Sequence, residues 1–134
     1  MSNETEKLTI NLGVVELAQI DVLVEQGIYS NRSDFIRTAI RKQLETHKEK
    51  IELSLSPISN ERDLTKVIGI LRISKKDLEK LARQNKKLAI STIGMLVIDT
   101  DISVELFEST VESVLLRGKL VASKEIKRII EELE

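Results

Sequence analysis

The first segment of the chain changes from an alternating to a helical pattern of apolar residues. Between residues 7 and 12 the apolar side chains are Leu8, Ile10 and Leu12, and the polar ones are Lys7, Thr9 and Asn11. This alternation predicts a short strand with one buried and one exposed face. From Val14 to Val24 apolar residues then recur every three or four positions and stop before Gly27, which predicts a first helix. Ser30 is placed as the N-cap of a second helix, whose apolar stripe runs from Phe35 to Leu44.

A lone strand leaves its backbone N–H and C=O groups without partners, and two following helices cannot supply them. A second copy of the chain can, because two such strands pair antiparallel about a two-fold axis. We therefore expect a homodimer whose first domain is not stably folded as a monomer. The expected dimer core is Leu8, Ile10, Leu12, Phe35, Ile36 and Ile40.

Three pieces of sequence in this order resemble the ribbon-helix-helix DNA-binding proteins of prokaryotes, in the CopG-like branch of small plasmid copy-number repressors. They are Glu-Lys-Leu-Thr-Ile-Asn-Leu at 6–12, the helix at 16–27, and Tyr-Ser-Asn-Arg-Ser-Asp-Phe-Ile-Arg at 29–37. The resemblance covers about 40 of the 134 residues. It implies that the ribbon enters the DNA major groove and that Lys7, Thr9 and Asn11 contact bases.

The chemistry of these three side chains agrees with base recognition. Asn bonds adenine through two atoms, Lys favours guanine acceptors, and Thr offers a hydroxyl group and a methyl group to thymine. Without the helices behind it, the same polar row is the solvated face of an ordinary strand.

The start of the second helix is a candidate phosphate site. Ser30, Asn31, Arg32 and Ser33 combine backbone N–H groups at a helix N-terminus with hydroxyl groups and a guanidinium group. Such contacts fix the position of a protein on DNA without selecting a sequence. The alternative interpretation is a simple helix cap, in which Asp34 offsets the helix dipole and no ligand is needed.

The second segment contains an internal repeat. Gly69, Gly94 and Gly118 lie 25 and 24 residues apart in similar apolar surroundings, and each is followed by a candidate helix cap: Ser74, Ser103 or Ser123. The apolar pattern predicts three strands that carry the glycines and a helix after each cap. The second of these helices, which follows Ser103, is predicted to include Val111 and Val114. Three strand-helix units in succession predict a parallel sheet with right-handed crossovers and helices on one side.

The chain is thus expected to be an α+β protein with a ribbon-helix-helix domain at 1–46, a linker at 47–63 around the single proline, Pro57, and a strand-helix repeat domain at 64–134.

Composition narrows the classes of function. There is no cysteine and only one histidine, His47, so thiolate catalysis, a disulfide framework and a His-rich metal site are not expected. We expect no metal, no cofactor and no enzymatic activity. The polar N-terminus and the absence of a long apolar stretch favour a cytoplasmic protein without a membrane span. The net charge of −1 gives no global basic signal, so contact with DNA must depend on local placement of charge.

These observations favour a homodimeric, sequence-specific regulator of transcription that binds double-stranded DNA, as a repressor. The repeat domain would either self-associate or bind a protein partner. One alternative is an antitoxin whose C-terminal domain binds a toxin. Another is a dimeric scaffold that does not bind DNA, for which the near-neutral charge is the best support.

Overall fold

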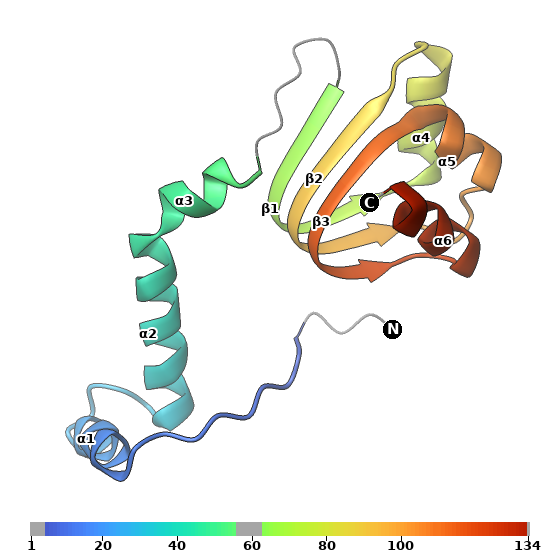
Figure 1. Ribbon diagram of the computed structural model, residues 1–134. Helices are drawn as coiled ribbons and strands as arrows, with labels where there is room; N and C mark the ends of the chain where they lie inside the picture. The colour runs from blue at the N-terminus through green and yellow to red at the C-terminus, as the bar shows by residue number, and fades with distance from the viewer. Residues whose placement is uncertain (1–4, 56–62, 134) are drawn as a thin grey trace. The chain divides into compact units, whose positions relative to one another are not determined.

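The computed structural model describes residues 5–55 and 63–133 and divides the chain into two compact units (Figure 1). One unit comprises Asn3–Ile51, and the other includes Glu52–Glu134. The segment predicted as a linker, 47–63, begins with a short helix, α3 (Lys48–Leu53). The proline expected in the linker, Pro57, lies outside the described residues.

The first unit contains α1 (Val14–Glu25) and α2 (Arg32–Thr46). Gly27 has a φ of +77°, a left-handed conformation that glycine adopts without steric cost. The N–H of Gly27 donates to the Val24 carbonyl, and the N–H of Ile28 donates to that of Leu23 (3.0 and 3.1 Å). These two bonds form a Schellman motif, which satisfies carbonyl groups left free at the helix end. The predicted end of the first helix at Gly27 is therefore confirmed.

The predicted strand at residues 7–12 is not formed within this chain, and residues 5–13 have no regular secondary structure. Leu8 is 83% exposed and Ile10 58% exposed, while Leu12 is half-buried. A strand requires a neighbour for its backbone groups, and no described segment of the same chain pairs with these residues. The alternating pattern is therefore present without the ladder that it predicts.

The second unit is a parallel sheet of three strands in the order β1-β2-β3 (Figure 1). The strands are β1 (Asp63–Ile73), β2 (Leu88–Ile98) and β3 (Val111–Val121), and they are followed by α4 (Lys75–Arg83), α5 (Val104–Thr110) and α6 (Lys124–Leu133), respectively. The predicted parallel strands are confirmed. The helix predicted to include Val111 and Val114 is wrong beyond Thr110. These two β-branched residues belong to β3 instead, and both are buried there.

The three serines predicted as helix caps each accept a hydrogen bond from a backbone N–H in the first turn of their helix. Ser74 and Asp77 form a capping box, in which the Asp77 N–H donates to Ser74 Oγ (3.2 Å) and the Ser74 N–H donates to Asp77 Oδ2 (3.0 Å). These hydrogen bonds to Ser74 lower the pKa of Asp77 from its ordinary value. Ser103 and Ser123 accept from the N–H groups of Leu106 and Ile126 (3.2 and 3.3 Å).

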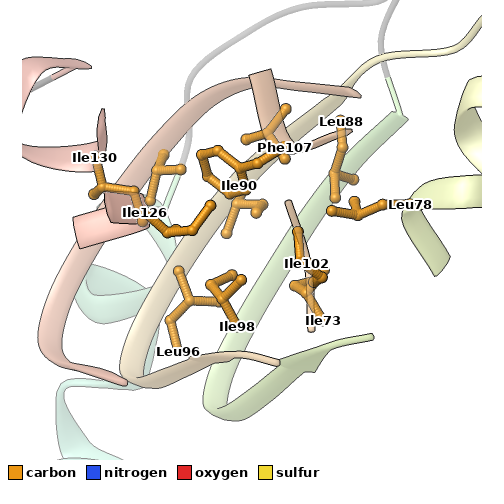
Figure 2. Close-up of a cluster of buried hydrophobic side chains, with 12 residues drawn as sticks. Ile73, Leu78, Leu88, Ile90, Leu96, Ile98, Ile102, Phe107, Ile126 and Ile130 are labelled. Carbon is orange, nitrogen blue, oxygen red and sulfur yellow. The ribbon is translucent and has the colours of Figure 1, made fainter. Parts of the chain in front are cut away.

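One continuous hydrophobic core fills the space between the sheet and its helices (Figure 2). Leu78 of α4, Phe107 of α5 and Ile126 of α6 point toward the sheet, and their exposure is 0%, 0% and 1%. The side chains from the strands that meet them are Ile73, Leu88, Ile90, Leu96, Ile98, Val111 and Val114. On the opposite face of β2, Ser91 Oγ donates to the carbonyl of Leu55 (3.0 Å), which joins the segment before the sheet to this unit.

Three glycines lie side by side on the three neighbouring strands. Gly69 is aligned with Gly94, and Gly94 with Gly118, and their φ values are +141°, +133° and +132°. A Cβ atom on Gly94 would overlap the carbonyl oxygen of Gly69, and a Cβ atom on Gly118 would overlap that of Gly94. The alignment predicted from the 25- and 24-residue spacing thus has a steric basis, because only glycine allows the backbones to approach this closely.

Candidate nucleic-acid interface

The three residues predicted to contact bases lie on the extended segment that precedes α1. Lys7, Thr9 and Asn11 are all exposed, and so are Leu8 and Ile10 between them. An isolated extended segment therefore presents polar and apolar side chains alike to solvent. Pairing with a second segment would separate them into two faces, because successive side chains of a strand point in opposite directions.

The start of α2 differs from the prediction in the identity of its cap. Asn31, not Ser30, is the N-cap, since its side-chain oxygen accepts from the Asp34 N–H (2.8 Å). Ser30 contributes its backbone N–H, which donates to Asp34 Oδ2 (3.0 Å). Asn and Ser are about equally good caps, so residue type alone could not choose between neighbours.

Once these hydrogen bonds are formed, the backbone donors that remain for a phosphate group are N–H groups of the first turn. The N–H groups of Arg32 and Ser33 lie in the first turn, where no carbonyl group of the helix can accept from them. The carboxylate of Asp34 occupies the same end of the helix and is held by Ser30. The residues predicted to contact phosphate thus lie at one helix end, with a negative charge already beside them.

The side chain of Arg32 is paired with Asp21 of α1. Arg32 Nε and Nη2 donate to the two carboxylate oxygens of Asp21 at 2.8 and 2.9 Å. These hydrogen bonds hold the pKa of Asp21 below its ordinary value and raise the pKa of Arg32. The pair is exposed, so water and salt screen it and a competing phosphate group can reach it. Sequence reasoning missed Asp21, because a separation of eleven residues matches no helical or strand spacing.

The residues predicted for the dimer core are partly covered at best in the single chain. Phe35 and Ile36 are half-buried, and Ile40 is 52% exposed. Phe35 packs edge-to-face against Tyr29, with ring centroids 5.0 Å apart, and this contact fixes the turn between the helices to the start of α2. No residue of α2 is buried, and only Ile20 is buried in α1.

The apolar residues left exposed in this unit are numerous for its size. Those at least 48% exposed are Leu8, Ile10, Val14, Val15, Val22, Ile28, Ile40 and Leu44. Covering a Val, Leu or Ile side chain completely is worth about 1.5–3 kcal/mol, so a partner that covers several of them would contribute substantial binding energy.

At 5–55 and 63–133, no three histidine or acidic side chains are grouped in a way that could hold a metal ion. None of the described helices is long and apolar enough to span a membrane.

Comparison with known proteins extends the likeness well beyond the first unit. The model of the ribbon-helix-helix transcriptional regulator family matches residues 3–127. The transcriptional regulator CdrS of Halobacterium salinarum is 31% identical over 45 residues, which cover 34% of this chain and 82% of that protein. The uncharacterized protein MJ1679 of Methanocaldococcus jannaschii is 28% identical over 74 residues, 55% of this chain and 70% of that protein. No solved structure matches the chain.

Proposed function

Because the chain belongs to the ribbon-helix-helix transcriptional regulator family, we propose that it is a homodimeric repressor that inserts a two-stranded ribbon into the DNA major groove. Each copy supplies residues 7–12 as one strand, paired antiparallel with the same residues of the other copy. A ribbon of this kind fits the width of the major groove.

The observation that carries the proposal is the exposure of Leu8 and Ile10 beside two helices whose apolar stripes are also exposed. In the proposed dimer, Leu8, Ile10 and Leu12 cover these stripes, including Ile40 and Leu44 of α2. The backbone groups of residues 7–12 gain partners in the same step. Folding of this unit and dimer formation are then a single event.

The opposite face of the proposed ribbon carries two copies of Lys7, Thr9 and Asn11. Asn11 is the side chain best suited to select one base, because its amide group can bond both N6 and N7 of adenine. Lys7 and Thr9 add a guanine contact and a thymine contact. Glu6 lies next to Lys7 and repels phosphate groups, so we expect modest affinity for each dimer.

Phosphate contacts come from the start of α2 in this proposal. The N–H groups of Arg32 and Ser33 face the backbone of DNA, with the hydroxyl groups of Ser30 and Ser33 beside them. Arg32 contributes its charge only after it exchanges Asp21 for a phosphate group. Because the Arg32–Asp21 pair is exposed, this exchange costs little free energy.

A salt titration of binding to duplex DNA tests the proposal. The logarithm of the association constant should fall linearly with the logarithm of the salt concentration, with a slope of about −0.9 for each phosphate group neutralised. A selected operator should bind more tightly than mixed-sequence DNA at every salt concentration. Absence of binding at low salt would instead favour the dimeric scaffold that does not act on DNA.

A further inference from the structure

The sheet of the second unit ends in two unpaired edges. Within residues 52–55 and 63–133, β1 pairs with β2 alone, and β3 pairs with β2 alone. Each outer strand is 11 residues long. No described strand pairs with the outer edge of either one, and a long edge of this kind is a site for association.

The hydrophobic core is open at the β1 end. A groove of about 720 Å³ runs between β1 and α4 and is lined by Thr65, Leu71, Asp77, Lys80, Leu81 and Gln84, among others. Leu71 of β1 and Leu81 of α4 belong to the core but are only half-buried. Leu96, which occupies the position of Leu71 in the neighbouring strand, is completely buried. Among the described elements, β2 has a neighbouring strand on both sides and α5 has a neighbouring helix on both sides, whereas β1 and α4 each have such a neighbour on one side only.

We propose that β3 of a second copy of the chain pairs in parallel with β1, with Gly118 opposite Gly69. This pairing repeats the step that joins β1 to β2 and β2 to β3, both of which are parallel with the glycines aligned. Since α4 packs against α5 and α5 against α6, the same step brings α6 of the second copy beside α4, over the groove. The contact is head-to-tail, so each copy can bind one neighbour through β1 and another through β3.

The charges on the two edges favour this register. The internal alignment predicts Lys66 opposite Leu115, Ile68 opposite Arg117, Ile70 opposite Lys119 and Arg72 opposite Val121. Every cation of one strand thus lies beside an apolar residue of the other. Ile68 and Ile70 are about half exposed, and the aliphatic stems of Arg117 and Lys119 can cover them while the charged ends reach water.

A slip of two residues in either direction is unfavourable. One slip places Lys66 opposite Arg117, and the other places Arg72 opposite Lys119. Like charges directly opposite one another destabilise a pair of strands. A slip of one residue would turn the apolar side chains of the incoming strand to the wrong face. The charge pattern therefore selects the register that the glycines also select.

The space beside Gly69 is consistent with an incoming strand. Gly94 and Gly118 each lie against the carbonyl group of the preceding strand, whereas no heavy atom of the described residues, apart from the two chain neighbours, lies within 4 Å of the Cβ position of Gly69. In the proposed pairing, the carbonyl group of Gly118 from the second copy occupies this space. Linked in this way, dimers bound to neighbouring DNA sites would bind cooperatively.

Disulfide trapping tests the proposed register, because the natural chain contains no cysteine and every introduced thiol is unique. Chains with Ile68→Cys and with Arg117→Cys are mixed and oxidised mildly. Aligned residues of neighbouring strands are about 5 Å apart, which a disulfide can bridge. We expect a 68–117 disulfide between copies, identified by mass spectrometry. An Ile93→Cys/Arg117→Cys chain gives the reference rate for an aligned pair, since these residues are neighbours within one chain.

Leu115→Cys is the matched control, because Leu115 is also exposed and lies two residues before Arg117 on the same face of β3. The 68–117 bond should form at least about tenfold faster than the 68–115 bond, since only the first pair is aligned. Equal rates for the two would overturn the proposal. A faster 68–68 bond in Ile68→Cys alone would also overturn it and would indicate a symmetric contact between two β1 strands. None of these readouts depends on DNA binding or on the N-terminal unit.

Charge substitutions at Ile68 supply a second measurement. Ile68→Lys places a cation opposite Arg117, and Ile68→Glu places an anion there, while both remove the same apolar side chain. Association beyond the smallest species is measured by sedimentation velocity over a range of protein concentrations. Ile68→Lys should weaken this association by about fivefold relative to Ile68→Glu, because two like charges then lie opposite one another in place of an anion and a cation. Equal association of the two variants would contradict the proposed contact.

Discussion

The guanidinium group of Arg32 forms two hydrogen bonds with the carboxylate group of Asp21, at 2.8 and 2.9 Å, and so joins the start of α2 to α1. The cation at the start of α2 is thus held by an internal partner. In the proposed DNA complex, Asp21 competes with a phosphate group for Arg32.

Asp21→Asn should strengthen DNA binding, because Arg32 no longer exchanges an internal partner for a phosphate group. The salt slope should change little, since the same phosphate groups are neutralised in both proteins. Fluorescence anisotropy with labelled duplex DNA measures both quantities. Asp101→Asn is the control, because it removes one exposed negative charge from the other unit. The same gain in both variants would mean that net charge, and not Arg32, is responsible.

Asn11→Ala should lower affinity for the preferred sequence by about 1–3 kcal/mol and leave non-specific binding unchanged, because a bidentate base contact is lost and no phosphate contact is. Binding to a panel of operators with single base changes should show that the loss is confined to one position in each half-site. An equal loss on every sequence would show that Asn11 does not select bases.

Asn31→Ala should lower the free energy of unfolding by about 1 kcal/mol, because the Asp34 N–H loses its acceptor. Ser30→Ala should change it by less than about 0.5 kcal/mol, since Ser30 contributes only its backbone N–H to the cap. Urea unfolding followed by circular dichroism at one fixed protein concentration compares the two. A larger effect of Ser30→Ala would restore Ser30 as the cap that the sequence first indicated.

Gly94→Ala should destabilise the second unit by about 3 kcal/mol or more, because strain at positive φ adds to overlap with the Gly69 carbonyl oxygen. Within one chain, Gly69→Ala has the same kind of backbone strain without the overlap, so about 1–3 kcal/mol is expected at protein concentrations too low for the proposed pairing of Gly69 with Gly118 of a second copy. Unfolding curves of the two variants therefore separate the two contributions. Equal losses would show that the close approach of the strands is not limiting.

Much of the second unit follows from its sequence, since the strong apolar periods and the spacing of the glycines predicted parallel strands with helices after each serine cap. The error at Val111 has a clear cause. A spacing of three or four residues continues from Phe107 through Val111 to Val114, although the chain leaves the helix at Thr110. Periodicity alone cannot mark that end, because no glycine or proline stands there.

The candidate DNA site was less accessible to sequence reasoning. Residue types suggested which side chains matter, but the pairing of Arg32 with Asp21 depends on how α1 and α2 pack, which no local pattern encodes. The neighbouring cap candidates Ser30 and Asn31 differ too little in preference to be separated without coordinates. The strand predicted at 7–12 is proposed to pair with a second copy of the chain, and a single sequence does not show such a pairing.

Residues 7–12 are proposed to pair between two copies of the chain, and the mass of the smallest species in solution tests this pairing most directly. Ile10→Asp and Thr9→Asp place the same charge on neighbouring residues that face opposite sides of the proposed ribbon. Sedimentation equilibrium at low protein concentration should give a dimer for the natural chain and for Thr9→Asp, and a monomer for Ile10→Asp. A dimer that survives Ile10→Asp unchanged, or a natural chain that is monomeric, would contradict the account.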